Sequence, residues 1–221
     1  MMMSPESFYE YYLKGKTTEQ IMTCIRRLKR EIGHCKKQLE CPLSNEMMVD
    51  PGPDVVLWAT RLYLERAKQA LQEAGGEYIP TAKEILAQQL KEDFHFIQQF
   101  VFTIGGYFGG FQTYTVCPKQ FPYYTVAHSL FDTEEQRDKV LYSEDEFQSM
   151  LDEIHLEEWK HHYNDPYVCD GTQWELTVSF NNGRRAMTWA GNNAFPPDFD
   201  KLEEFFGCLD DNEEDESNDE D

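Results

Sequence analysis

CDGTQWELTVSFNNGRRAMTWAGNNAFPP, residues 169–197, contains a β-hairpin whose pairing can be predicted almost residue by residue. Asn182-Gly183 is the dipeptide preferred in a two-residue type I′ turn, because both central residues of that turn have positive φ angles. Pairing outward from this turn sets four pairs of residues opposite one another: Ser179 with Ala186, Val178 with Met187, Thr177 with Thr188, and Leu176 with Trp189.

Alternation of side chains along each strand gives this hairpin one apolar and one polar face. The apolar face carries Leu176, Val178, Met187 and Trp189, and the opposite face carries Thr177, Ser179, Ala186 and Thr188. Because the turn residues and the hydrophobic pattern select the same register independently, we expect this register in the folded protein.

The rest of the chain is long enough for one domain or two small ones, with 221 residues of which 40% are hydrophobic. Its net charge of −21 is placed unevenly. Residues 1–75 hold 11 Lys and Arg against 10 Asp and Glu, whereas residues 76–221 hold 9 against 31. Nine of these acids lie in residues 210–221, which contain no apolar residue, so we expect a disordered acidic tail over residues 209–221.

The composition favours a soluble, intracellular and cytoplasmic protein. No stretch approaches the roughly 18 apolar residues of a membrane span, and the first residues lack the pattern of a secretory signal. The six cysteines are dispersed without a CxxC pair, which is typical of reduced thiols.

The N-terminal region, residues 1–93, reads as helical. Thr17 to Gln20 form a capping box for a helix over about 18–40. Asp54 is expected to cap a second helix over about 55–74, and Thr81 to Glu84 open a third over 82–93. The first two are predicted to pack as an antiparallel, coiled-coil-like hairpin. Its apolar residues are Ile21, Cys24, Ile25, Leu28, Ile32, Cys35 and Leu39 in the first helix, and Val55, Trp58, Ala59, Leu62, Ala70 and Leu71 in the second.

The hydrophobic period changes from helical to alternating after residue 93. A meander over 94–128, a helix over 144–163, the hairpin over 174–190 and a helix over 198–206 follow. The 144–163 helix could break near His155 and resume through Trp159 to Tyr163. We therefore predict an α+β protein: the helical hairpin, then an α+β domain over 94–208 in which helices pack on a small antiparallel sheet.

Two groups of residues are candidates for protein interaction. Arg26, Arg30 and Lys37 fall opposite the apolar stripe of the first helix, where they could dock on an acidic surface of a partner, of another protomer or of this chain's own second half. Tyr107 and Phe108 lie in a glycine-rich connection, GGYFGG, where exposed aromatics can bind.

A metal site is a weaker candidate. His155, Glu158 and His162 have spacings of three and four residues, so one face of a helix could carry all three, and Cys169 follows. No HExxH or paired CxxC pattern accompanies them. The chain also lacks the GxSxG elbow and the GK[ST] of a phosphate-binding loop. No cofactor and no enzymatic activity are therefore expected.

The segments DGTQWEL (170–176), the Asn-Gly hairpin and GNNAFPP (191–197) together resemble a pattern in uncharacterised proteins of gut Firmicutes and their mobile elements. The resemblance is specific over residues 169–199. It implies a bacterial accessory protein and carries no function to transfer.

These observations favour a non-enzymatic, acidic protein-interaction module or small regulator. One alternative is a nucleic-acid mimic that inhibits a nucleic-acid-binding defence protein, since carboxylates can imitate phosphates. Another is a metal-dependent enzyme built on the region from His155 to Cys169. Direct binding of nucleic acid is not expected at a net charge of −21, nor is binding to a membrane, and homo-oligomers could form through the N-terminal helices.

The acidic tail yields a first prediction. Deletion of residues 210–221 should change the melting temperature by less than about 2 °C, because the tail has no apolar residue to bury. Differential scanning calorimetry of the full-length and truncated chains measures this. A loss of several degrees would mean that the tail docks on the folded part.

Overall fold

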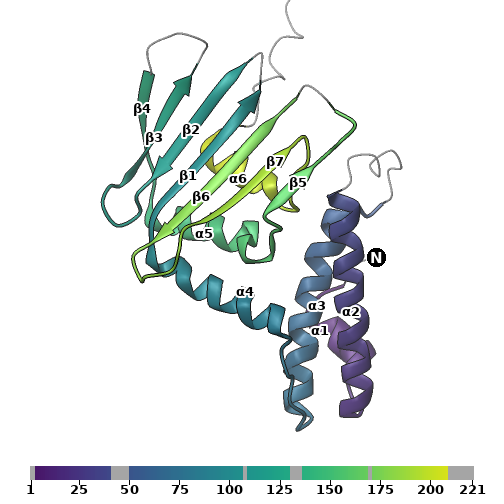
Figure 1. Cartoon of the computed structure of the whole chain (residues 1–221). Coiled ribbons are helices and arrows are strands. Elements are labelled where there is room, and N and C mark those ends of the chain that lie inside the picture. Colours follow the sequence, from purple (N-terminus) through teal and green to yellow (C-terminus); the bar gives the residue numbers. More distant parts are fainter. Residues whose placement is uncertain (1–2, 41–49, 107–108, 130–135, 169–170, 209–221) are drawn as a thin grey trace, which may run out of the picture. The chain divides into compact units, whose positions relative to one another are not determined.

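The computed structural model describes residues 3–40, 50–106, 109–129, 136–168 and 171–208 (Figure 1). The chain forms two compact units, Met1–Gln89 and Leu90–Asp221, here called the helical unit and the sheet unit. Helices and a largely antiparallel sheet make this an α+β protein, as predicted. Within the described ranges, no helix combines the length and apolar composition that a membrane crossing requires. The expected acidic tail lies outside the described residues.

The helical unit begins with a short helix, α1 (Pro5–Phe8), and a π-helical turn, η1 (Tyr9–Leu13). Two long helices, α2 (Thr18–Leu39) and α3 (Pro53–Glu73), follow and lie side by side (Figure 1). The Thr17 capping box of α2 is confirmed. The predicted Asp54 cap of α3 is wrong: Gly52 is the N-cap and Pro53 starts the helix, because proline's fixed φ angle suits the first helical position.

The core of the helical unit joins the N-terminal segment, residues 3–13 with α1 and η1, to both long helices. Its buried residues are Phe8, Leu13, Ile21, Ile25, Leu28, Leu64, Ala67, Ala70 and Leu71. The predicted buried side of α3 is partly wrong, since Trp58 is 61% exposed and Leu62 is 37% exposed, while Leu57 and Leu64 are buried. Apolar residues surround much of α3, so helical spacing permits more than one buried stripe, and packing of its alanines against α2 selects this one.

A third helix, α4 (Ala82–Asp93), leads through a 3₁₀ turn, η3 (Phe94–Phe96), into a seven-stranded sheet. The strands are β1 (Ile97–Gly106), β2 (Gly110–Val116), β3 (Tyr123–Ser129), β4 (Gln136–Leu141), β5 (His162–Asn164), β6 (Gln173–Phe180) and β7 (Met187–Asn192). Their order is β4-β3-β2-β1-β6-β7-β5, with β5 parallel to β7 and every other pair antiparallel. Strand β4 was not predicted.

Helices α5 (Glu144–Ile154) and α6 (Phe199–Phe206) pack on one face of this sheet (Figure 1). The buried face includes Phe100, Phe102, Val116, Leu176, Val178 and Trp189, each at most 1% exposed. The buried indoles of Trp159 and Trp174 donate hydrogen bonds to the Ile154 and Ala194 carbonyls. The indole N–H groups therefore have hydrogen-bond partners, while the rings themselves pack in the apolar core.

The register of the 174–190 hairpin is confirmed by the pairs Val178–Met187, Thr177–Thr188 and Leu176–Trp189. The predicted two-residue type I′ turn is wrong. Such a turn needs positive φ angles at both central residues, but only Gly183 has one, at 87°, and Asn182 does not. Strand β7 also begins only at Met187. The cause is tertiary. The Asn182 side chain donates to Asp93 and accepts from the Arg184 backbone, and Arg184 also pairs with Asp93.

The expected break of the 144–163 helix near His155 is confirmed, but its expected resumption as a helix through Trp159 to Tyr163 is wrong. Helix α5 ends at Ile154, because His155 adopts the left-handed conformation with φ 49°. A 3₁₀ turn, η4 (Leu156–Glu158), follows, and His162–Asn164 pair with β7 as strand β5. The apolar residues read as a continued helix, Trp159 and Tyr163, are buried in the sheet unit from these other conformations.

Substitutions of two neighbouring residues of β7 test whether only one face of the sheet is buried. Trp189→Ala should destabilise the protein by about 3–5 kcal/mol, because the indole is 1% exposed in the core. Thr188→Ala should cost about 1 kcal/mol, since it removes only an exposed hydrogen bond with Thr177. Urea unfolding of both variants measures the difference. Equal costs would mean that the threonine face is also covered.

Candidate functional site

The outer side of α2 carries Arg26, Arg30 and Lys37, here called the basic face. All three are exposed, opposite the buried Ile25 and Leu28. None of the three forms an ion pair within the described ranges of the chain; the Arg30 Nε donates a 3.4 Å hydrogen bond to the Arg26 carbonyl instead. Three cationic groups are thus presented to solvent on one helix.

Other bases of the helical unit neutralise its carboxylates. Arg66, only 9% exposed, donates to Glu6 at 3.0 Å and to Glu73 at 3.3 Å, and its guanidinium lies 3.9 Å from the centre of the Tyr9 ring. Because Glu6 and Tyr9 belong to the N-terminal segment, this buried arginine holds that segment on α3.

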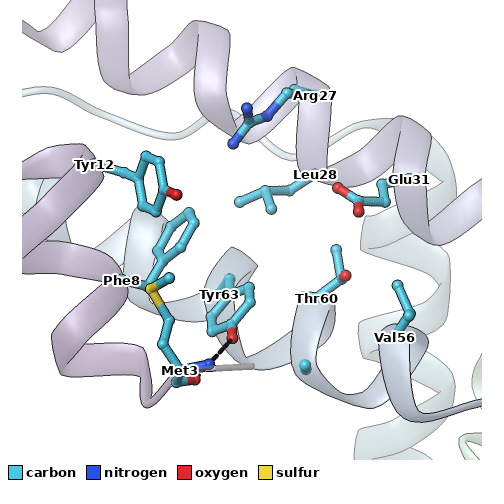
Figure 2. A pocket seen from close by; sticks show the side chains of 10 residues that line it. Met3, Phe8, Tyr12, Arg27, Leu28, Glu31, Val56, Thr60 and Tyr63 are labelled. Atoms are coloured by element: carbon cyan, nitrogen blue, oxygen red, sulfur yellow. Dashed lines mark hydrogen bonds between the residues drawn. The ribbon is translucent and has the colours of Figure 1, made fainter. Parts of the chain in front are cut away.

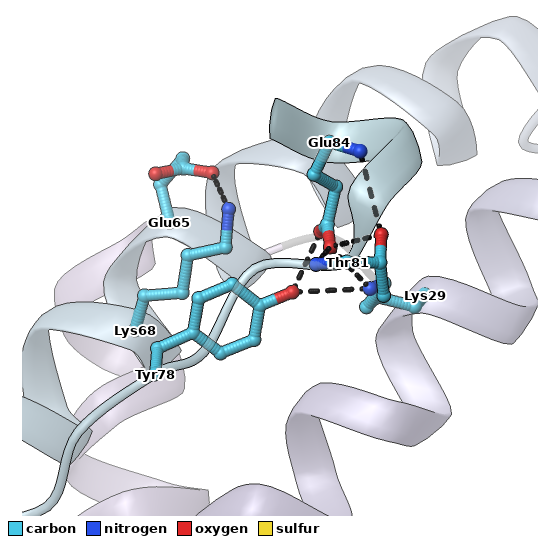
Figure 3. A network of polar contacts seen from close by, with 6 residues as sticks. All are labelled: Lys29, Glu65, Lys68, Tyr78, Thr81 and Glu84. Carbon is cyan, nitrogen blue, oxygen red and sulfur yellow. Dashed lines mark hydrogen bonds and ion pairs between the residues drawn. The ribbon is translucent and has the colours of Figure 1, made fainter. Parts of the chain in front are cut away.

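A second polar network joins α2 to the segment after α3 (Figure 3). Lys29 lies 2.9 Å from the Glu84 carboxylate and donates to the Tyr78 hydroxyl at 3.0 Å. Tyr78 donates to Glu84 at 2.6 Å, and the backbone N–H and hydroxyl of Thr81 donate to the same carboxylate. The predicted capping box of Thr81 and Glu84 is therefore confirmed. The same Glu84 carboxylate also binds Tyr78 and Lys29.

This network determines the pKa of Glu84. Burial alone would raise that pKa, but the hydrogen bonds from Tyr78, Thr81 and Lys29 outweigh burial and lower it to about 2. Burial also raises the pKa of the Tyr78 hydroxyl. Glu84 is therefore ionised and Tyr78 protonated at neutral pH, and Lys29 is neutralised, unlike the basic face.

A pocket lies beside the basic face, between the N-terminal segment, α2 and α3 (Figure 2). Its volume is about 330 Å³. Its lining residues are Met3, Phe8, Tyr12, Arg27, Leu28, Glu31, Val56, Ala59, Thr60 and Tyr63. The Tyr63 hydroxyl bonds to the backbone of Met3, and the Tyr63 ring stacks on Phe8 at 4.5 Å. These contacts make the N-terminal segment one wall of the pocket.

The candidate metal ligands do not share a helix, so the premise of that prediction is wrong. His155 ends α5, Glu158 lies in η4, and His162 is an exposed residue of β5. Cys169 lies outside the described residues. Within the described ranges, no group of three or more His, Cys, Asp or Glu residues is arranged to hold a metal ion.

Tyr107 and Phe108 lie outside the described residues. Among the cysteines, burial raises the pKa of the Cys208 thiol to about 11, so this thiol is protonated at neutral pH and is a poor nucleophile.

The basic face was predicted from the sequence, but the pocket was not. Its residues come from three segments, and only Leu28 and Ala59 belong to the predicted buried stripes. No spacing in the sequence marks the pocket, since Arg27 lies on the polar side of its helix much as Arg26 does.

Comparison of the chain with models of protein families found no match, and comparison with curated proteins found none either. Identification of a function therefore depends on the site itself.

The Glu84 network gives a prediction about pH. A carboxylate whose pKa is lowered by folding stabilises the protein above its unfolded pKa of about 4.5, and this stabilisation is lost as the pH falls towards 2. Glu84→Gln should therefore cost about 1–3 kcal/mol at pH 7, and this cost should shrink towards zero as the pH falls from 5 to 2.5.

Urea unfolding of the wild type and the variant over this pH range measures the cost. Glu10→Gln is the matched control, because Glu10 forms an exposed ion pair with Lys14 and should cost little at any pH. Parallel curves for the wild type and Glu84→Gln would contradict the assignment of the low pKa to Glu84.

Proposed function

We propose that this protein is a non-enzymatic protein-interaction module that docks on an acidic surface of a protein partner through the basic face. The observation that carries the proposal is the exposure of Arg26, Arg30 and Lys37 without ion pairs among the described residues, in a chain of net charge −21. Exposed charges of one sign on a helix steer and orient a partner of opposite sign.

The distribution of charge supports an acidic partner for the helical unit. Residues 1–89 hold 12 Lys and Arg and 12 Asp and Glu, so the whole excess of negative charge belongs to residues 90–221. Several acids of the helical unit are neutralised in ion pairs, namely Glu6, Glu10, Glu65, Glu73 and Glu84. The cations of the basic face therefore remain available to carboxylates from outside this unit.

Helices α2 and α3 serve in this proposal as a rigid, coiled-coil-like hairpin that presents the basic face. The biological setting is a bacterial accessory protein, supported only by the resemblance over residues 169–199. Binding of another protomer's acidic sheet unit to the basic face would give a homo-oligomer, which the following experiment distinguishes from a different partner.

Charge reversal at the basic face tests the proposal. The triple variant Arg26→Glu, Arg30→Glu and Lys37→Glu should fold normally, because exposed charges outside networks change stability by about 0.5 kcal/mol each. It should lose the partners that the wild type captures from a lysate of its host at low salt, as identified by mass spectrometry. Binding by the wild type should weaken steeply as salt screens the charges.

The matched control reverses three exposed lysines of the same unit, Lys14, Lys16 and Lys83, which gives the same change in charge. This control should retain every partner. Light scattering of the pure protein reports self-association, and its loss in the first variant alone would identify the partner as a second copy. Retention of all partners by both variants would overturn the proposal.

A further inference from the structure

The pocket between the N-terminal segment, α2 and α3 is lined by the hydroxyl of Thr60, for which the described residues supply no hydrogen-bond partner. Thr60 is 3% exposed. An exposed threonine of α2, Thr23, bonds instead to the carbonyl four residues earlier. The Thr60 hydroxyl is therefore available for a hydrogen bond with a polar group of a ligand in the pocket.

The walls around Thr60 are apolar. Phe8, Leu28 and Ala59 are buried side chains at the pocket surface, and Val56 and Tyr63 complete the lining from α3. Figure 2 shows Phe8 and Tyr12 on one side of the space and Thr60 and Val56 on the other. A volume of about 330 Å³ accommodates one large side chain.

Charged groups occupy the rim. Arg27 and Glu31 are one helical turn apart on α2 and lie on either side of Leu28 (Figure 2). Neither forms an ion pair within the described part of the chain. The carboxylate of Glu31 and the hydroxyl of Thr60 can both accept hydrogen bonds, whereas the guanidinium of Arg27 can bind a carboxylate.

The side chains that combine a large apolar ring with a hydrogen-bond donor at its edge are tryptophan and tyrosine. We propose that this pocket is the anchor site for one tryptophan or tyrosine of the acidic partner. The ring lies against Phe8, Leu28 and Ala59, its N–H or O–H donates to Thr60 or Glu31, and an adjacent carboxylate of the partner binds Arg27. This inference rests on the proposed function, since it specifies what the acidic partner carries.

The rim of the pocket adjoins the basic face at one point, because Arg27 lies next to Arg30 on α2. Arg27 directly follows Arg26 and precedes Arg30 by three residues, the spacing of neighbours on a helix. A short acidic segment can therefore contact the basic face while its aromatic side chain enters the pocket. Buried aromatic anchors surrounded by polar contacts carry most of the affinity in many interfaces.

Three fluorescein-labelled peptides test the anchor: EDEAAWAAEDE and two versions with alanine or phenylalanine in place of tryptophan. Fluorescence anisotropy should show that the wild-type protein binds the tryptophan peptide at least tenfold more tightly than the alanine peptide. The phenylalanine peptide should bind about threefold to tenfold more weakly than the tryptophan peptide, because phenylalanine has no donor for Thr60 or Glu31.

Thr60→Val keeps the shape of the side chain and removes its hydroxyl. It should reduce the preference for tryptophan over phenylalanine and leave the preference for phenylalanine over alanine. The matched control is Thr188→Val, which removes an exposed hydroxyl from the sheet unit and should change neither preference.

The outcomes separate the two proposals. Equal binding of all three peptides, or no binding up to 1 mM, would overturn the anchor. All three peptides could bind equally to the wild type and lose binding to the triple variant of Arg26, Arg30 and Lys37. That result would overturn the anchor but support recognition of acidic partners by the basic face. Unchanged binding of all peptides after that reversal would instead overturn the proposed function.

Discussion

Burial of one side of the long helices and of the central strands is the constraint on which the rest of this structure depends. In the sheet unit, alternation along the strands directs Phe100, Phe102 and Trp189 towards α5 and α6, which leaves neighbouring residues such as Thr103 and Thr188 on the opposite face. In the helical unit, packing of Ile25 and Leu28 against α3 directs Arg26 and Arg30 outward. The position of the basic face is therefore a consequence of how the core forms.

Pairing of carboxylates then decides which bases remain available. Arg66 and Lys29 each bind an acid that lies far from them in sequence, and in doing so attach the segments on either side of the long helices. The Lys29–Glu84 pair is partly sheltered from solvent on both sides, whereas Arg66 is buried but its partner Glu6 is largely exposed. The basic face has no equivalent acids among the described residues. The bases that hold the fold together, Arg66 on α3 and Lys29 on α2, are thus distinct from those of the basic face.

The basic face and the adjacent pocket would contribute to recognition in different ways. Charge acts over roughly 8 Å at physiological salt, so it accelerates and orients an encounter without distinguishing closely related acidic surfaces. The pocket requires a ring of the right size with a hydrogen-bond donor at its edge, which few acidic segments present. Together they would select an aromatic residue in an acidic context, a pattern more specific than acidity alone.

Sequence by itself determined the features that depend on neighbouring residues. The capping boxes at Thr17 and Thr81 and the register of the last hairpin followed from local hydrogen bonding and a period of two. Tertiary structure decided what depends on distant residues. Asn182 bonds to Asp93, 89 positions away in sequence, instead of forming the expected turn, and in α3 Leu57 is buried while Trp58 stays exposed. The pocket brings together Phe8, Leu28 and Thr60, whose proximity no spacing in the sequence encodes, because it arises only when three separate segments pack.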